Sequence, residues 1–437
     1  MTTVAPTYEL SASELAARIA SGAVTPLEAV TSSLERIEDL EPRMHAWAYL
    51  ARDSALAEAE VMSQEAGAGK FRGPLHGVPV GLKDVFHAEG MPTVANSKTT
   101  DPDARYPNSA VAAGLRAAGA IILGKCETVE FAGMGVPPPT RNPWNLEHTA
   151  GGSSSGSGAA VGARMVPAAI GTQTGGSNLR PAAYCGVTGF KPTHGGISRE
   201  GLLTVSWSLD HPGIIARSAA DLALVFRAIA RQPVETPPAS RPWRIGLVRE
   251  FFLERSEPAV VGATRQAVAK LGNSGATVSE AKLPPLFAAQ QSIHRLIMSP
   301  EMVTYHAPRH AEKSELMTPR HVQSVRAFSL VPATYYLQAL RARRALKEQL
   351  SALFEQFDIL AMPTTPAPAP EGLESTGDAS LLSPWSLVGF PAATVPCGTV
   401  DGLPIGLQLV GKAGSDATVL AAAAFAESIL GQLELPF

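Results

Sequence analysis

Three polar residues in glycine-rich surroundings have the types and the setting to cleave an acyl bond. Ser177 lies in the segment TQTGGS, Ser153 lies 24 residues earlier in GGSSS, and Lys83 ends the apolar run GVPVGLK. Glycines beside a serine let the backbone approach a ligand closely and turn several N–H groups toward one point. Such donors can hold the oxyanion that forms when a serine attacks a carbonyl. The pattern therefore indicates nucleophilic acyl transfer.

The lysine is the candidate base for this chemistry. A free serine is a poor nucleophile and needs a base within hydrogen-bond reach, and lysine can serve only where burial lowers its pKa from ~10.4 toward ~7 to 8. Lys83 follows valine, glycine and leucine, so we expect it to be buried. The alternative is a strand-end lysine whose ammonium reaches water past its apolar stem.

Two other motifs in the same part of the chain point elsewhere. Residues 152–156 formally match the G-x-S-x-G nucleophile elbow, but that motif needs a buried strand before it, and residues 141–150 read RNPWNLEHTA. Residues 119–126 nearly spell a phosphate-binding P-loop, yet Cys126 stands where a Ser or Thr is needed, and AIIL is typical of a strand. We interpret both matches as accidental.

The Gly/Ser-rich stretch over residues 151–193 must also be distinguished from a flexible linker, which such tracts commonly form. Apolar residues are interleaved with the glycines and serines between positions 159 and 170, and a second apolar run follows the GGS of residues 175–177. A solvated linker would gain nothing from these apolar side chains. We therefore expect a packed segment.

The flanking segments indicate an α/β architecture that would position these residues. Ser11 with Glu14, and Thr25 with Glu28, form capping boxes that predict two opening helices. From residue 72 onward, short apolar runs predict strands alternating with helices, as in AVAAGLRAAG followed by AIILGK. Strand-like runs toward both ends of the chain favour one intertwined sheet over separate domains.

The second half of the chain is more helical. Residues 232–242, QPVETPPASRP, form a proline-rich break that is either a domain boundary or a surface loop. Residues 255–360 are the most helical and most charged part, and apolar positions within 333–357 fall largely on one helical face. A helical layer or lid is predicted there.

Composition excludes several classes of protein. Of 437 residues, 45% are hydrophobic and 17% are charged, against a typical charged fraction of ~25%, which indicates a well-cored globular protein. A net charge of −3 without basic runs argues against a nucleic-acid partner. The start lacks a signal-peptide pattern, and no apolar segment approaches the ~20 residues that span a bilayer, so we expect a soluble, cytoplasmic protein.

Cysteines and histidines point to neither disulfides nor metals. The three cysteines, Cys126, Cys185 and Cys397, are far apart without CxxC spacing, which argues against a disulfide framework and a cysteine-based metal site. None of the ten histidines has HxH or HExxH spacing, so none is assigned to a metal or to catalysis. We expect reduced thiols, no metal and no cofactor.

Together, these segments resemble the amidase signature family of serine hydrolases. The resemblance is carried by a lysine after G-[IV]-P-[IV], a GGSS loop, a GGS loop, and then RPA, CG and KPT, which stand at residues 77–83, 151–154, 175–177, 180–182, 185–186 and 191–193. Further likeness is found in EFAGMG, RNPWN, SLDHPG, FDILAMPTTPAPAP and GLPIGLQLVG. The resemblance covers essentially the whole chain and weakens only between about 250 and 335.

The resemblance implies a fold and a set of site residues. The fold is a large mixed β-sheet covered by α-helices on both faces, in a single amidase domain over residues 1–437, with a variable helical region at 250–335 that shapes the substrate pocket. Ser177 would be the nucleophile, Ser153 the intermediate serine held in a cis peptide, and Lys83 the base. The oxyanion hole would be formed by the N–H groups of Thr174, Gly175, Gly176 and Ser177.

The nucleophile segment departs from the common family form GTDTGGSIRxPA. Here it reads GTQTGGSNLRPA, which puts Gln173 in place of Asp and Leu179 in place of Arg, with Arg180 one residue later. The two changes look coupled, because removing an Asp–Arg pair together leaves no unpaired buried charge. This form resembles malonamidase-like members, in which the shifted arginine helps to recognise a substrate carboxylate. Arg180 is therefore either a substrate-binding residue or a brace for the loop.

The sequence predicts a serine hydrolase that cleaves the carbon–nitrogen acyl bond of amides, and also of aryl amides or carbamates (urethanes), through an acyl-enzyme. Its partner would be a small-molecule amide or carbamate, without nucleic acid or membrane, and a homodimer is left open. One alternative is a transamidase subunit that releases ammonia for tRNA-dependent amidation, although that function predicts the GTDTGGS form. The other is an inactive scaffold, which predicts loss of Lys83, Ser153 or Ser177.

Overall fold

A single mixed sheet runs through the computed structural model, which describes residues 6–133, 135–233 and 241–435. Over these residues the sheet has 11 strands in the order β1-β3-β2-β4-β6-β5-β10-β11-β9-β7-β8. The strands are β1 (Trp47–Leu50), β2 (Pro79–Lys83), β3 (Ile121–Cys126), β4 (Ala168–Gln173), β5 (Thr188–Lys191), β6 (His211–Ala216), β7 (Arg244–Val248), β8 (Thr277–Ala281), β9 (Ile359–Pro363), β10 (Ala392–Val400) and β11 (Leu403–Val410). Strand β2 is parallel to β3 and β4, β7 is parallel to β8 and β9, and the other pairs are antiparallel.

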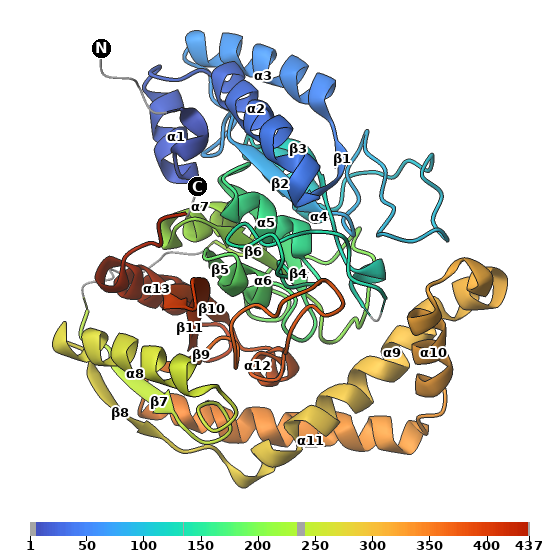
Figure 1. Ribbon diagram of the computed structural model, residues 1–437, viewed down its shortest axis with the longest axis vertical. Coiled ribbons are helices and arrows are strands. Elements are labelled where there is room, and N and C mark those ends of the chain that lie inside the picture. Colours follow the sequence, from blue (N-terminus) through green and yellow to red (C-terminus); the bar gives the residue numbers. More distant parts are fainter. Residues whose placement is uncertain (1–5, 134, 234–240, 436–437) are drawn as a thin grey trace.

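Helices surround this sheet (Figure 1). The α-helices are α1 (Ala12–Ala20), α2 (Pro26–Met44), α3 (Arg52–Gly67), α4 (Ala110–Ala117), α5 (Ser155–Gly162), α6 (Leu179–Tyr184), α7 (Ala219–Ile229), α8 (Pro258–Asn273), α9 (Gln290–Lys313), α10 (Pro319–Phe328), α11 (Ala333–Ser351), α12 (Ser383–Val388) and α13 (Asp416–Leu430). Short 3-10 helices are Thr7–Glu9, Glu130–Ala132, Pro285–Ala289, Ser314–Leu316 and Ala352–Glu355. Figure 1 shows α9 and α10 at the lower right and α11 along the bottom, far from α1, α2 and α3 at the top.

Successive residues of the central strands point into different apolar clusters, because side chains alternate between the faces of a sheet. In β4, Ala168 and Ile170 belong to the cluster that also holds buried residues of α1, α4, α7, α8 and α13. Ala169 belongs instead to the cluster with α2, α3 and α5. A third cluster joins α9, α11 and α12 to Leu360 and Met362 of β9. Helices therefore cover both faces, as the resemblance predicts.

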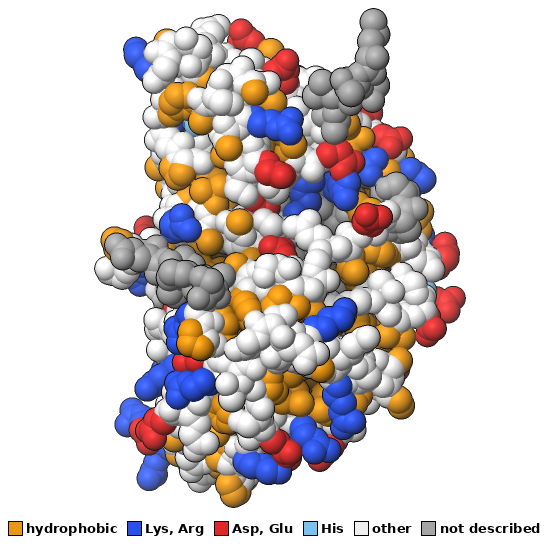
Figure 2. All heavy atoms as spheres, turned by 90° about the vertical axis from the view of Figure 1, so that its left-hand side faces the viewer, with side chains coloured by type: hydrophobic (Ala, Val, Ile, Leu, Met, Phe, Trp, Pro, Cys, Tyr) orange, Lys and Arg blue, Asp and Glu red, His pale blue; other side chains and the backbone are white. Residues whose placement is uncertain are grey.

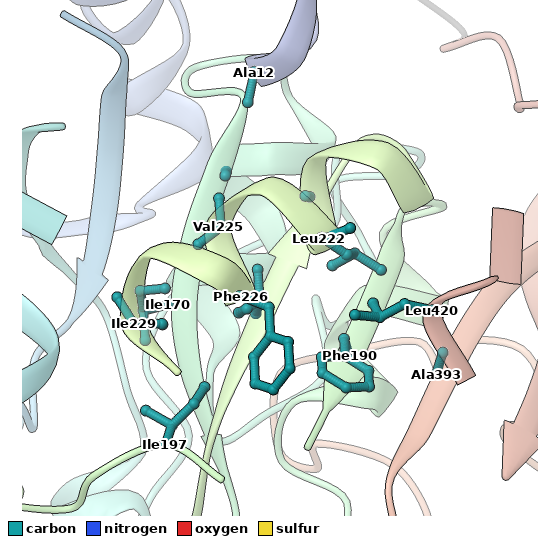
Figure 3. Packing of buried hydrophobic residues seen from close by; sticks show 14 of the residues in the cluster. Ala12, Ile170, Phe190, Ile197, Leu222, Val225, Phe226, Ile229, Ala393 and Leu420 are labelled. Atoms are coloured by element: carbon teal, nitrogen blue, oxygen red, sulfur yellow. The ribbon is translucent and has the colours of Figure 1, made fainter. Parts of the chain in front are cut away.

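The core beneath α7 shows how one face is filled (Figure 3). Leu222, Val225 and Phe226 of α7 lie over the strands, and Phe226 meets Phe190 of β5 edge-on, with ring centroids 5.1 Å apart. Leu420 of α13 lies beside Phe190. Edge-to-face packing is a preferred arrangement for aromatic rings and adds to the free energy of burying them.

Most of the predicted elements are confirmed. Both capping boxes are present, and they begin α1 and α2. The Gly/Ser-rich stretch is not a linker, because residues 155–162 form α5 and residues 168–173 form β4, all buried. The near P-loop match is accidental, since residues 121–126 form strand β3. The helical region of residues 255–360 contains one strand that the sequence analysis missed, β8, whose partly exposed edge position leaves little apolar pattern.

The chain on either side of the proline-rich break belongs to the same sheet. Strand β6 lies before it and β7 after it, while residues 234–240 of the break lie outside the described residues. The break therefore does not separate two sheets, and one domain over residues 1–437 stays a prediction.

Three further features concern the helices, the surface charges and the cysteines of the described residues. None of the described helices is both long and apolar enough to cross a membrane. Figure 2 shows one face of the molecule, on which Lys and Arg side chains are interspersed with Asp and Glu rather than gathered in one area. Cys126 and Cys185 are buried, Cys397 is partly buried, and all three are free thiols.

Candidate active site

The predicted base lies in the centre of the molecule. Lys83 is the last residue of β2, a strand between β3 and β4, and its side chain is 0% exposed. Its Nζ lies 2.8 Å from Ser153 Oγ, 3.0 Å from Ser154 Oγ and 2.7 Å from Thr172 Oγ1. The alternative of an ammonium that reaches water is therefore wrong.

The surroundings of Lys83 favour its neutral form. Burial lowers the pKa of Lys83 well below its usual value, the charge of Arg180 lowers it further, and the carboxylate of Asp210 opposes the shift. The three hydrogen-bond partners of Nζ are neutral hydroxyl groups, which do not stabilise an ammonium as an adjacent carboxylate would. An uncharged amine is the form of lysine that can accept a proton.

Ser153 lies in the loop that leads into α5. The peptide bond between Gly152 and Ser153 is cis, as the resemblance implies, and Ser153 is 3% exposed. The flanking glycines are required by packing: a Cβ on Gly152 would lie 2.6 Å from Cγ2 of Thr376, and Gly151 has a φ of +81°. A larger residue at either position would displace the loop that places Ser153 Oγ 2.8 Å from Lys83 Nζ.

Ser177 lies in the loop between β4 and α6, partly exposed to a cavity of about 290 Å³. The two serine loops are joined directly, because the N–H of Ser154 donates to the carbonyl of Ser177 at 3.1 Å. Ser177 therefore lies beside the loop that contains Ser153, and Ser153 in turn contacts Lys83 of β2. The cavity is lined by Ala132, Gly133, Thr174, Gly175, Gly176, Ser177, Arg180, Val205, Gln291, His294, Arg295, Met298, Asp378, Ala379, Ser380 and Ser383.

The loop from Thr174 to Ser177 has its carbonyl groups held from outside. His294 Nε2 lies 2.9 Å from the Thr174 carbonyl, and Ser386 Oγ donates to the Gly175 carbonyl at 2.7 Å. Within the described part of the chain, no oxygen accepts from the N–H groups of the four predicted oxyanion-hole residues. In a trans peptide, the C=O of one residue and the N–H of the next residue point in opposite directions. Holding the carbonyls therefore leaves unpaired donors beside Ser177, the predicted nucleophile.

Gln173 and Leu179, the two departures from the common motif, are in direct contact in the structure. The side-chain oxygen of Gln173 accepts the N–H groups of Asn178 and Leu179, at 3.1 and 3.0 Å, and its Nε2 donates to Ser386 Oγ at 3.1 Å. Leu179 is fully buried in the apolar cluster of α9, α11 and α12. A neutral amide and an apolar side chain thus fill these positions without an unpaired charge.

Arg180 is occupied by backbone contacts. Its guanidinium donates to the Gly152 carbonyl from Nε at 3.1 Å and from Nη2 at 2.5 Å, and to the Gly377 carbonyl from Nη1 at 2.6 Å. Nη2 also donates to Thr376 Oγ1 at 3.0 Å, and the residue is 6% exposed. These contacts join the Ser153 loop to residues 376–377, which favours the bracing role over carboxylate binding.

Arg180→Met is expected to lower kcat/KM for every substrate by a similar factor, because it removes donors that hold the Ser153 loop. The free energy of unfolding should also fall by about 3 kcal/mol or more, since buried carbonyls lose a charged partner. The measurement compares one acidic amide with one neutral carbamate of similar size, in wild type and variant. A loss confined to the acidic amide would instead assign Arg180 to substrate binding.

Several contact residues of the site were missed in the sequence. Ser154 lies in the GGSS loop and Thr172 near the end of β4, so their positions in the sequence beside the predicted residues were the available signal. Asp210, in SLDHPG, accepts a hydrogen bond from Thr174 Oγ1 at 2.6 Å. His294 and Ser386 lie in segments without a motif, and nothing in the sequence marks them.

Comparison with known proteins identifies the family of this chain. The chain matches the Amidase family model over residues 28–420 and therefore belongs to the amidase family. It is 35% identical to a glutamyl-tRNA(Gln) amidotransferase subunit from Chloroflexus aggregans, over 94% of this chain and 95% of that protein. The subunit of the same name from Moorella thermoacetica is also 35% identical, over 96% of this chain and 97% of that one.

Solved structures show the same fold. A crystal structure of an amidase superposes with a TM-score of 0.90 at 32% identity, covering 97% of this chain and all of that one. The native peptide amidase from Stenotrophomonas maltophilia superposes with a TM-score of 0.85 at 30% identity, covering 99% of both chains. The α/β fold with its mixed sheet is thus the fold of amidase enzymes.

Proposed function

We propose that this protein hydrolyses the carbon–nitrogen acyl bond of a small amide through an acyl-enzyme on Ser177. The observation that carries the proposal is the buried Lys83, whose Nζ lies 2.8 Å from Ser153 Oγ among neutral partners. The unpaired N–H groups around Ser177 supply the second requirement, which is a site for the oxyanion. Cleavage of amides is the chemistry of the family to which the chain belongs.

The proton relay follows from the hydrogen bonds of Lys83. The hydroxyl of Ser154 donates to the Thr172 carbonyl at 3.3 Å, so its oxygen is left to accept from Lys83. A neutral lysine has one lone pair, which remains free to take the proton of Ser153. Lys83 Nζ takes that proton as Ser153 Oγ takes the proton of Ser177, and Ser177 Oγ attacks the substrate carbonyl carbon.

The remaining steps return the proton. The oxyanion of the tetrahedral intermediate is held by the loop N–H groups, and the protonated relay delivers its proton to the leaving nitrogen as the carbon–nitrogen bond breaks. Water then attacks the acyl-enzyme, with the same relay accepting its proton, and the free acid leaves with Ser177 restored.

The cavity supports a small polar substrate. Its volume of about 290 Å³ lies at the lower end of the ~300 to 1,000 Å³ typical of ligand pockets. Polar side chains surround it, including Gln291 and Arg295 of α9 and, from a distant part of the chain, Asp378. We therefore propose small polar amides as the preferred substrates. Carbamates of similar size come second, and bulky aryl amides come last. The contribution of α9 also supports the prediction that residues 250–335 shape the substrate pocket.

A second candidate function is the release of ammonia as part of an amidotransferase. It is favoured by the relatives named as glutamyl-tRNA(Gln) amidotransferase subunits, which match this chain over nearly its full length. The same chemistry at Ser177 would then release ammonia from an amide donor for use on a tRNA-bound acid. Gln173 in place of the Asp of the GTDTGGS form favours a hydrolase that acts alone.

One experiment separates these functions. The purified chain is given a panel of small primary amides that includes glutamine, together with anilides and carbamates, and release of ammonia or amine is measured beside Ser177→Ala. We expect the chain alone to hydrolyse small primary amides. Glutamine hydrolysis that requires co-purified partner chains and glutamyl-tRNA would support the second function. No release on any substrate, with no labelling of Ser177 by a fluorophosphonate, would contradict both and support a scaffold.

A further inference from the structure

His294 is a residue of helix α9 that contacts the nucleophile loop. Its Nε2 lies 2.9 Å from the carbonyl oxygen of Thr174, and the residue is 6% exposed. A carbonyl can only accept a hydrogen bond, so Nε2 must carry the proton. The contact joins residues 120 positions apart in the chain.

Thr174 is held on its other side by a buried carboxylate. Its Oγ1 donates to Asp210 Oδ1 at 2.6 Å, and Asp210 Oδ2 accepts the N–H groups of Val205 and Ser206 at 2.9 and 3.0 Å. The side chain of Thr174 is thus fixed to the segment before β6. The orientation of its carbonyl, however, depends on His294.

The peptide group between Thr174 and Gly175 lies between two anchored groups, the Thr174 side chain on Asp210 and the Gly175 carbonyl on Ser386, and its own carbonyl is held by His294. Gly175 and Gly176 follow it, and glycine samples backbone conformations that other residues avoid. The carbonyl of this peptide faces His294, so the N–H of Gly175 points the opposite way. Rotation of this peptide would turn that donor away from the nucleophile.

We propose that His294 is a positioning residue of the oxyanion hole: by holding the Thr174 carbonyl, it keeps the Gly175 N–H directed at the substrate oxyanion. This role rests on the proposed amide hydrolysis at Ser177. Burial lowers the pKa of His294, the hydrogen bond to the Thr174 carbonyl opposes this shift, and the charges of Arg343 and Arg295 add to it. The net lowering favours the neutral ring, whose single proton lies on Nε2.

The position of His294 couples the loop to substrate binding. Gln291, Arg295 and Met298 of the same helix line the cavity that holds Ser177. His294 itself also lines this cavity, so a substrate bound there would lie against the helix that holds the Thr174 carbonyl.

The test compares His294→Leu, His294→Gln and His294→Asn. The amide nitrogen of Gln can occupy the place of Nε2 and donate to Thr174, whereas the shorter Asn matches Nδ1. We expect Leu and Asn to lower kcat by about 10- to 100-fold, somewhat less than loss of an oxyanion donor, with KM nearly unchanged. Affinity for a small aldehyde that forms a tetrahedral adduct with Ser177 should fall by the same factor, and Gln should restore most of both.

Thr304→Val is the matched control. Thr304 is exposed on the same helix, and its Oγ1 donates to the backbone carbonyl of Pro300 at 2.8 Å, so this variant removes a side-chain donor far from the loop. It should retain wild-type kcat and aldehyde affinity.

The outcomes distinguish the two proposals. If His294→Gln is folded but as impaired as His294→Leu, or if His294→Leu keeps wild-type kcat and aldehyde affinity, the positioning role is wrong. Should His294→Leu fail to fold, the contrast between the Gln and Asn variants decides in its place. A wild-type chain that forms no aldehyde adduct and releases no product would overturn the proposed hydrolysis itself, and the positioning role with it.

Discussion

Ser177→Ala is expected to remove amide hydrolysis and fluorophosphonate labelling together, with a loss of kcat of more than about 10⁴-fold. The reason is that the variant has no oxygen that can form the acyl-enzyme, while the rest of the site is unchanged. Ser177 is only partly buried and lines the cavity, so the alanine variant does not bury an unpaired group in the core. The free energy of unfolding should stay within about 1 kcal/mol of wild type.

The measurements for this variant are steady-state hydrolysis, labelling and denaturant unfolding on the same preparation. Activity above about one percent of wild type would show that Ser177 is not the nucleophile. Loss of activity together with a large loss of stability would also fail to match the expectation, because the serine would then have a structural role.

Lys83→Met is expected to be as damaging as loss of the nucleophile. Methionine keeps an unbranched apolar side chain of similar length in the buried site but cannot accept a proton. Lys83→Arg is the matched variant: arginine stays protonated at all accessible pH values and cannot accept a proton, so it should be equally inactive. Substantial activity in the Arg variant would mean that Lys83 acts by its charge and not as a base.

The wild-type pH profile tests the same residue. Burial lowers the pKa of Lys83 well below its usual value, and the neutral amine, which predominates above that pKa, is the active form. kcat/KM should therefore rise with pH through the folded pKa of Lys83 and level off above it, at a pH below the ~10.4 of a free lysine. An optimum near pH 5 would contradict this assignment.

Local signals made the helices and the core of the site predictable. Capping boxes at Ser11 and Thr25 involve residues three positions apart, so the sequence contains all that is needed to place the start of each helix. The motif loops likewise place Ser153 and Ser177 next to glycines that the structure shows to be required by close packing. The cis peptide at Gly152 is confirmed, but only the resemblance implied it.

Non-local contacts explain what the sequence could not predict. The periodicity of α9 shows which face is apolar, but it does not show that His294 meets a carbonyl 120 residues earlier. The sequence left two roles open for Arg180, because its partners Thr376 and Gly377 lie almost 200 positions away. Strand β8 was missed for a related reason: it is held by pairing with β7 and not by its own pattern.

The anchoring of the nucleophile loop has a consequence for the newly made chain. Lys83, Ser153 and Ser177 all lie in the first half of the sequence, whereas the side chains that hold the loop carbonyls come from His294 and Ser386. A ribosome-bound chain that has emerged only to residue 290 contains the proposed nucleophile and base but lacks the side chains of His294 and Ser386. On the proposed mechanism, we expect activity to arise only after the last third of the polypeptide has been made and packed.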